Sequence, residues 1–180
     1  MDEITVLLVI ASKEFQQIEY GVTRKVLIDA GFVVVTASDL SDRAIAKDGS
    51  KVHVDITLSQ VRINNYQGIF FIGGPGALEH LDNNTSYKIL QEAALQHKPI
   101  GAICIATRIL AKAGVLRDKY ATGWNEDGLL NTLFAENGVV YLPEEKVVVE
   151  SNVITAIDPS AAQQFGEQIV ELLQSKQTWG

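Results

Sequence analysis

Cys104, the one cysteine of the chain, is the residue best placed to do chemistry. It lies between a short apolar segment, Ile100–Ile103, and a segment with helical spacing that stops near Gly114. The apolar period changes there from two to 3.6 with no spacer, which predicts a sharp strand-to-helix turn. A thiol at such a turn projects from the carboxyl edge of a sheet, near helix N–H groups that favour the reactive thiolate. The alternative is a small buried apolar residue, as most free cysteines are.

Glu19 is the second candidate, because its helical spacing places it on an apolar face. The segment Phe15–Ala30 predicts a helix that ends at Gly31. The face that Glu19 shares comprises Phe15, Ile18, Val22 and Val26. A buried carboxyl group stays protonated or finds a donor, and a protonated one would donate a hydrogen bond to a thiolate. Alternatively, Glu19 lies at the edge of this face and its carboxylate reaches water.

The glycine-rich loop Gly73–Gly76 follows a third apolar strand, Gly68–Ile72. Glycines at this position let backbone N–H groups approach an anion or a developing oxyanion. No Gly-Lys-Ser/Thr sequence follows, and the spacing does not fit the dinucleotide fingerprint. We therefore expect no nucleotide cofactor, and the alternative for this loop is a tight turn without a ligand.

Composition restricts the classes of function. The chain has 180 residues, of which 47% are hydrophobic and 21% charged, and its net charge is −7, so we expect one globular domain over residues 1–180. The acidic balance, without basic runs, argues against nucleic acid and membrane surfaces as partners. One cysteine excludes an internal disulfide and a Cys-based zinc site, and we expect no metal. Met1-Asp2-Glu3 leads straight into a strand without a signal peptide, which favours the cytoplasm.

Apolar strands alternate with helices along the chain. We expect strands at Ile4–Ile10, Phe32–Thr36, Gly68–Ile72, Ile100–Ile103 and Val153–Ile157, and extended segments at Tyr120–Gly123, Val139–Leu142 and Val147–Glu150. Further helices are expected at Asn84–His97 (capped by Asn84 or Thr85), Gly128–Glu136 and from Asp158-Pro159 to about Leu173. A turn at residues 47–50 predicts a β-hairpin. This order indicates a doubly wound α/β domain whose ligand site lies at the carboxyl ends of the strands.

Several segments together match one family. They are the first strand with Glu19 after it, Asp48-Gly49, Asp55–Leu58, Gly73–Ala77, Ala102–Cys104 and Leu110–Leu116. With them the chain resembles the DJ-1/PfpI family over nearly its whole length. The resemblance implies a flavodoxin-like three-layer sandwich: a mostly parallel sheet with helices on both faces. It also implies Cys104 on a nucleophile elbow, Glu19 as its carboxyl partner, the N–H groups of Gly74 and Ile105 as an oxyanion site, and a homodimer or larger assembly with the site near an interface.

The chain departs from the hydrolytic members of that family. Peptidase-like members have a histidine directly after the cysteine, where this chain has Ile105, and others have one where Trp124 aligns. None of the three histidines, His53, His80 and His97, matches a catalytic position, and His80 is expected on the surface. Trp124 and Pro75 are expected as pocket walls, with packing at an interface as the alternative for Trp124. Residues 125–127 are expected to form a surface turn, with intrusion into the site as the alternative.

Two functions follow from this resemblance, both with a small electrophile or an oxidant as partner; a third possibility is a scaffold whose site binds a ligand without either chemistry. In the favoured one, the protein is redox-responsive, and Cys104 is oxidised to a sulfinic acid that protonated Glu19 holds. In the other, a glyoxalase-type enzyme, Cys104 attacks a 2-oxoaldehyde and Glu19 moves the proton. Both predict a thiol of depressed pKa. Peptidase or amidase activity is disfavoured, because general acid–base catalysis by an imidazole is missing.

Overall fold

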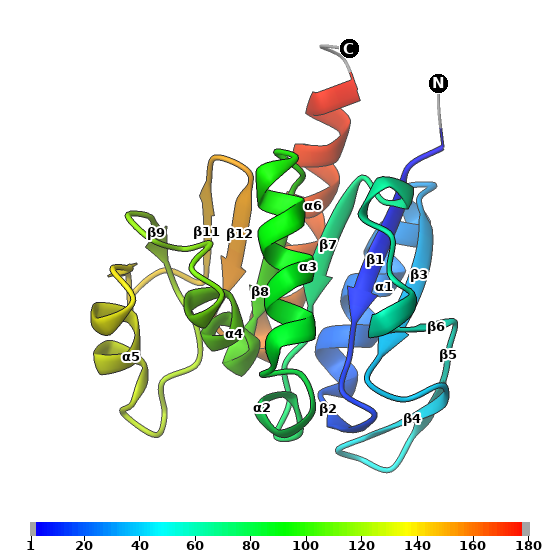
Figure 1. Cartoon of the computed structure of the whole chain (residues 1–180), viewed down its shortest axis with the longest axis horizontal. Coiled ribbons are helices and arrows are strands. Elements are labelled where there is room, and N and C mark those ends of the chain that lie inside the picture. Colours follow the sequence, from blue (N-terminus) through cyan, green and yellow to red (C-terminus); the bar gives the residue numbers. More distant parts are fainter. Residues whose placement is uncertain (1–2, 178–180) are drawn as a thin grey trace.

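The computed structural model describes residues 3–177. A seven-stranded sheet of order β11-β12-β8-β7-β1-β3-β6 runs through it (Figure 1). Its strands are β1 (Thr5–Val9), β3 (Val33–Ser38), β6 (Ile56–Thr57), β7 (Gly68–Phe71), β8 (Ile100–Ile103), β11 (Val147–Glu150) and β12 (Val153–Ala156). All neighbours pair in parallel except β11, which is antiparallel to β12. The predicted mostly parallel sheet is confirmed; the short strand β6 was not predicted.

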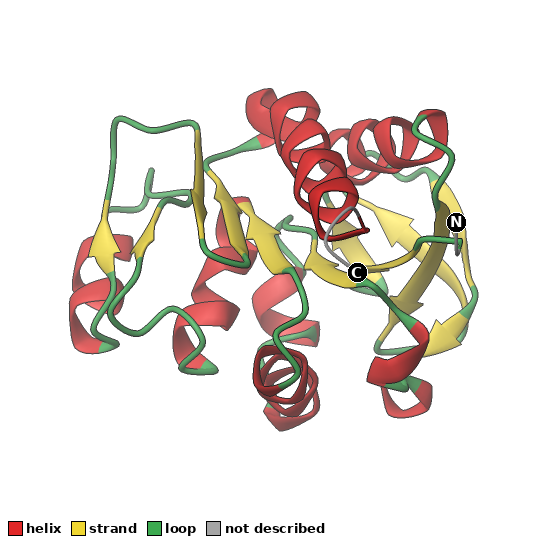
Figure 2. Ribbon diagram, turned by 90° about the horizontal axis from the view of Figure 1, so that it is seen from above, coloured by secondary structure: helices red, strands yellow, loops and turns green. Residues whose placement is uncertain are grey.

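Helices cover both faces of this sheet, as Figure 2 shows from above. The helices are α1 (Gln17–Asp29), α2 (Ala77–His80), α3 (Asn84–Leu95), α4 (Thr107–Lys112), α5 (Leu130–Glu136) and α6 (Ala162–Gln177). On one face α1 packs against α6, and on the other α3 packs against α4. The flavodoxin-like sandwich is thereby confirmed. Within residues 3–177, no helix has both the length and the apolar composition needed to cross a membrane.

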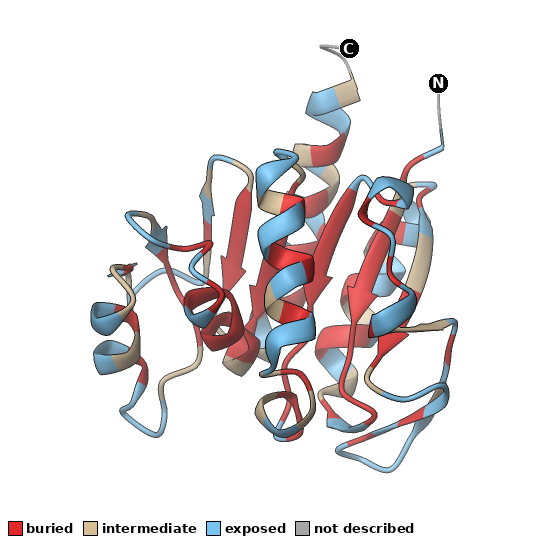
Figure 3. Cartoon of the chain, viewed as in Figure 1, coloured by how far each residue is buried: buried red, intermediate tan, exposed pale blue. Residues whose placement is uncertain are grey.

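The central strands are buried because both faces of the sheet are covered. Every residue of β7, β8 and β12 is buried, as are four of the five residues of β1 (Figure 3). Such strands have near-continuous apolar sequences, which is why they were recognisable without alternation. They hold the core rigid and bring their carboxyl ends to one edge, the lower edge in Figure 1.

The predicted hairpin is present at that edge. Strands β4 (Asp42–Ala46) and β5 (Lys51–Val54) pair antiparallel, and β2 (Lys13–Phe15) adds to β4 in parallel. The start of the first helix was therefore predicted wrongly. Phe15 belongs to β2, and Gln16 caps α1 by accepting a hydrogen bond from the Glu19 N–H at 2.8 Å.

The apolar face of α1 also differs from its prediction. The buried residues are Glu19, Tyr20, Thr23 and Leu27, whereas Ile18 is 48% exposed. The helix is turned so that an acid, a hydroxyl and a phenol face the protein, because α6 and β3 pack against it.

Two further details concern helix ends and a small extra sheet. Asn83, not Asn84 or Thr85, caps α3, with its side chain accepting from the N–H groups of Thr85 and Ser86. Asp158 accepts from the Ser160 N–H, as predicted, at the short helix η4 (Pro159–Ala161) that precedes α6. A two-stranded parallel sheet of β9 (Tyr120–Ala121) and β10 (Val140–Tyr141) joins distant segments, a pairing that local sequence does not indicate.

Candidate active site

Cys104 occupies a strained turn at the end of a buried strand. Strand β8 ends at Ile103, the 3₁₀ turn η3 covers Cys104–Ala106, and α4 follows without a spacer. Cys104 has a φ of 63°, in the left-handed region that non-glycine residues rarely adopt. Its carbonyl is fixed by hydrogen bonds from the Trp124 N–H at 3.3 Å and the Thr107 hydroxyl at 3.0 Å. The predicted elbow is present, and these bonds keep the thiol in place.

The glycine loop after β7 packs directly against this turn. A Cβ atom on Gly73 would lie 2.9 Å from both the Cys104 Cβ and the Glu19 Oε2, so no larger residue fits. Gly74 has a φ of 118°, and a Cβ there would lie 2.5 Å from the backbone nitrogen of Gln16. The loop therefore brings β7, β8 and the start of α1 together.

Glu19 is completely buried behind the cysteine. Its Oε2 accepts a hydrogen bond from the Gly73 N–H at 3.2 Å, and its carboxyl group also contacts Cys104. The contact with Cys104 is a loose one, because Oε1 is buried without a well-formed hydrogen bond among the described residues. The interpretation of Glu19 as an edge residue in water is therefore wrong.

Burial raises the pKa of Glu19 to about 8, although the hydrogen bonds from Cys104 and Gly73 lower it. The carboxyl group is thus neutral at pH 7. Since Oε2 accepts from the Gly73 N–H and Oε1 has no partner, the proton belongs on Oε1.

The thiol departs from its predicted behaviour. Burial raises the pKa of Cys104 above its ordinary value, and so do the charge and hydrogen bond of Glu19. The Ile105 N–H lowers this pKa, but its effect is smaller. The prediction that the pKa of Cys104 is depressed is therefore wrong. When either Cys104 or Glu19 loses its proton, the site gains one buried negative charge, and this charge opposes the loss of a proton from the other group.

Cys104 is 8% exposed and opens onto a cavity of about 630 Å³. The predicted residues Gly74, Pro75, Ile105 and Trp124 also line this cavity, while Glu19 lies beneath it. The structure thus brings all six predicted site residues to one place. The Ile105 N–H interacts with the thiol, which makes it a donor available to charge on the sulfur or on a bound oxygen.

Among the charged residues of the cavity, sequence reasoning missed Lys47 and Asp158 and gave Glu126 and Asp127 only as the less favoured alternative. Lys47, Glu126, Asp127 and Asp158 line it as well. Glu126 and Asp127 form a turn, as predicted, but the turn faces the cavity. An ion pair with Arg108 holds this turn in place. The Arg108 side chain is only 4% exposed, and its Nη2 lies 2.7 Å from the Asp127 Oδ1.

Arg108 also lies over the Trp124 ring, 5.5 Å from its centroid. An arginine on the core-facing side of α4 with an aspartate downstream was the only available signal in the sequence.

The histidines stand apart from the thiol, as expected from the sequence. None of them lines the Cys104 cavity. His80 lies at the end of α2, with its Nδ1 3.1 Å from Asp39 Oδ2 and its side chain only 19% exposed, so it is less of a surface residue than predicted.

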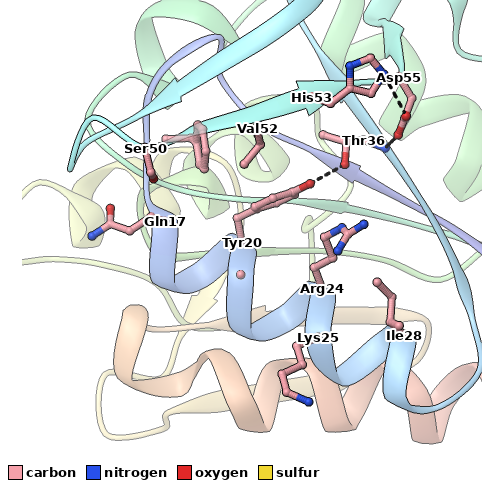
Figure 4. A pocket seen from close by; sticks show the side chains of 12 residues that line it. Gln17, Tyr20, Arg24, Lys25, Ile28, Thr36, Ser50, Val52, His53 and Asp55 are labelled. Carbon is pink, nitrogen blue, oxygen red and sulfur yellow. Dashed lines mark hydrogen bonds and ion pairs between the residues drawn. The ribbon is translucent and has the colours of Figure 1, made fainter.

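A second cavity, of about 610 Å³, lies between α1 and the hairpin (Figure 4). Tyr20 points into it and its hydroxyl is 2.7 Å from the Thr36 Oγ1. His53 Nε2 is 3.6 Å from Asp55 Oδ1, and Arg24 and Ile28 complete the side formed by α1. No thiol or buried acid lines this cavity, so we do not assign it chemistry.

Comparison with known proteins agrees with this geometry. A model of the DJ-1/PfpI family matches residues 4–172. An uncharacterized protein of Methanocaldococcus jannaschii is 32% identical over 175 residues, which cover 97% of this chain and 84% of that one. The crystal structure of a ThiJ/PfpI domain protein from Brachyspira murdochii has a TM-score of 0.90 at 23% identity, covering 97% and 99% of the two chains. Oxidized DJ-1 of Toxoplasma gondii has a TM-score of 0.81 at 25% identity, covering 97% and 92%. The chain therefore belongs to the DJ-1/PfpI family.

Proposed function

We propose that this protein is redox-responsive, and that a peroxide oxidises Cys104 to a sulfinic acid held by Glu19. The Cys104 sulfur attacks one peroxide oxygen, and the thiol proton passes to the departing oxygen as the O–O bond breaks, so that water leaves and a sulfenic acid remains. A second peroxide adds another oxygen in the same way. In each step the sulfur loses two electrons and one peroxide is reduced.

One observation carries this proposal: a neutral, fully buried carboxyl group faces the only sulfur that lines the cavity, and its Oε1 lacks a well-formed hydrogen bond. A sulfinate oxygen on Cys104 would accept the proton that Oε1 carries. Charge-assisted hydrogen bonds of this kind are about twice as strong as neutral ones, so the product would be stabilised at this oxidation level. The Toxoplasma relative, whose structure is of an oxidized form, supports the same chemistry here.

Oxidation followed by mass spectrometry tests the proposal. We expect a gain of two oxygens on the peptide with Cys104 after peroxide treatment, resistant to dithiothreitol and absent in Cys104→Ala. Glu19→Gln keeps a neutral donor and should still stop at two oxygens. Glu19→Leu removes the donor, and there the third oxygen should be added about tenfold faster. Equal product distributions in Glu19→Leu and the unaltered protein would overturn the role of Glu19.

A second candidate is the glyoxalase-type reaction, which the Ile105 N–H beside the thiol favours. The sulfur would add to the aldehyde carbon of a 2-oxoaldehyde, and the carbonyl oxygen would take a proton to give a hemithioacetal. Glu19, ionised once its proton has passed to that oxygen, would then move a proton from the hemithioacetal carbon to its neighbour, and water would release the hydroxy acid from the resulting thioester.

The two functions differ in their response to Glu19→Gln. Lactate formation from methylglyoxal should vanish in this variant, because an amide cannot act as the base, whereas sulfinate formation should persist. Turnover that survives Glu19→Gln would exclude the glyoxalase mechanism.

We also propose a cytoplasmic homodimer or larger assembly. Ile18 and Ile28 on α1 are 48% and 42% exposed, and Ile45 on the hairpin is 40% exposed, which supports a protein partner on this side. A reducing compartment would keep the single thiol free. Light scattering would give the assembly size, and a monomeric mass at micromolar concentration would contradict it; cell fractionation tests the location.

A further inference from the structure

The charges around the Cys104 cavity are unevenly arranged. Lys47 lies on the hairpin side, at the turn between β4 and β5, and Glu126, Asp127 and Asp158 lie on the opposite walls. Asp127 is neutralised by Arg108, whose hydrogen bond lowers the pKa of Asp127 and keeps it ionised. Neither Lys47 nor Glu126 forms an ion pair within residues 3–177. With Arg108 included, the acids outnumber the cations.

Asp158 is the acid whose charge reaches the sulfur. Its side chain accepts from the Ser160 N–H at 2.8 Å, so the carboxylate is held in one position at the start of η4. Its negative charge raises the pKa values of both Cys104 and Glu19. No cation contributes to the pKa shift of either Cys104 or Glu19. Arg108 is paired with Asp127.

The floor of the same cavity holds an unpartnered group. Glu19 is fully buried beneath Cys104 and its Oε1 lacks a well-formed hydrogen bond. Because that carboxyl group is neutral at pH 7, it offers a donor to a ligand atom bound at the sulfur but no positive charge. An anion entering here would meet Asp158 and Glu126 without a cation at the reacting atom.

We propose that the Cys104 cavity selects uncharged or cationic electrophiles and oxidants and rejects anionic ones, with Asp158 as the residue that sets this preference. The inference deepens the proposed function, on which it rests, by naming the class of reactant. Hydrogen peroxide and methylglyoxal fall within the class, whereas reactants with a carboxylate or sulfonate group fall outside it. Asp158 is a positioning and selectivity residue, since it acts through its field and not by contact with the sulfur.

Three methanethiosulfonate reagents test the preference on the full chain. They react with thiols by the same mechanism but differ in charge. The thiolate attacks the sulfenyl sulfur, the bond between the two reagent sulfurs breaks, and methanesulfinate leaves as a mixed disulfide forms. The reagents carry a methyl, a trimethylammonioethyl or a sulfonatoethyl group. The cation-to-anion ratio of second-order rate constants cancels the thiolate fraction, so pKa changes between variants do not affect it.

For the unaltered protein we expect this ratio to exceed that of 2-mercaptoethanol by about tenfold at low salt and to fall towards it in 0.5 M salt. Asp158→Asn should lower the ratio about fivefold, and asparagine still caps η4, so the fold is kept. Lys47→Gln should raise the ratio about twofold, because it removes the opposing charge.

The matched control is Glu171→Gln on α6, which removes the same charge about 20 Å along the helix axis from Asp158. The low-salt measurement is made at about 0.1 M, where the Debye length is about 10 Å and this charge is screened. It should leave the ratio unchanged. A ratio equal to that of 2-mercaptoethanol, or an Asp158→Asn ratio within experimental error of the unaltered protein, would overturn the inference.

The uncharged reagent separates this inference from the proposed function. If it labels Cys104 and peroxide yields the sulfinate while the ratio is flat, only the charge preference is wrong. If the ratio behaves as expected but no sulfinate forms, only the redox function is wrong. Failure of the uncharged reagent to label the native protein would overturn both.

Discussion

The molecule has two cavities of nearly equal size on either side of the start of α1, and only one of them is equipped for chemistry. They measure about 630 and about 610 Å³. The consecutive residues Glu19 and Tyr20 lie at different cavities: Glu19 lies under the Cys104 cavity, and Tyr20 lines the other. Tyr20 is satisfied by Thr36 at 2.7 Å, whereas Oε1 of Glu19 lacks a well-formed hydrogen bond. Neither volume nor an unsatisfied atom alone marks a reactive site, because Gln17 beside the second cavity also has a buried, unpartnered Oε1. The Cys104 cavity differs because it combines an unsatisfied acid with a thiol on a strained turn.

The positions of the two cavities in the fold explain this difference. The Cys104 cavity lies at the carboxyl ends of β7 and β8, where rigid central strands fix the loops that follow them. The other cavity lies between α1 and the hairpin, outside the main sheet. His53 there has a side chain that is 74% exposed, so water can solvate it freely.

The largest expected effect concerns Glu19 and pH. Its pKa in the folded state is raised from 4.5 to about 8, so its contribution to stability is complete below pH 4.5 and is lost as pH rises through 8. The free energy of unfolding of the unaltered protein, relative to Glu19→Gln, should fall by about 4 kcal/mol between pH 4 and pH 8. Urea unfolding at a series of pH values measures it.

If the free energies of unfolding of the unaltered protein and of Glu19→Gln changed in parallel with pH, Glu19 would be ionised when buried. The main distinction between the two cavities would then be lost. Tyr20→Phe serves as the control on the other side of α1, because it should run parallel to the unaltered protein over this pH range.

Alanine substitutions of one glycine at each cavity should differ in their effect on stability. Gly74→Ala places a Cβ 2.5 Å from backbone atoms at a φ of 118° and should cost about 3 kcal/mol of stability. Gly21 lies on α1 beside the second cavity, where a Cβ would meet nothing within 4 Å. Gly21→Ala should therefore stabilise the protein by about 0.5–1 kcal/mol through helix propensity. Thermal unfolding of both variants tests this, and a destabilised Gly21→Ala would show that the second cavity is covered in solution.

A similarly small effect is expected for Tyr20→Phe. It removes the hydrogen bond to Thr36 and should cost about 1 kcal/mol. Peroxide oxidation of Cys104, followed by mass spectrometry, should proceed at an unchanged rate, because Tyr20 faces away from the thiol. A change of rate beyond twofold would indicate that the two cavities are coupled through α1 and would break the distinction drawn between them.

Much of this arrangement was determined by the sequence itself. The buried strands are continuous apolar segments, and the hairpin has its turn at Lys47–Ser50, so their type follows from local residues. The elbow at Cys104 was predictable because strand and helix periods meet there without a spacer. The location of a thiol at the carboxyl edge of the sheet follows from these elements and the rules of parallel α/β folds.

Tertiary structure alone decided the chemistry of the pair. Whether Glu19 faced water or the thiol depended on the rotation of α1 about its axis, which packing against α6 and β3 fixes. The predicted depression of the thiol pKa failed for the same reason: helix N–H groups are local, but burial and the facing acid come from segments far away in the chain. Asp158 and Glu126 likewise reach the cavity only through the fold. Electrostatic effects depend on distance and solvent exposure, and a linear sequence contains neither.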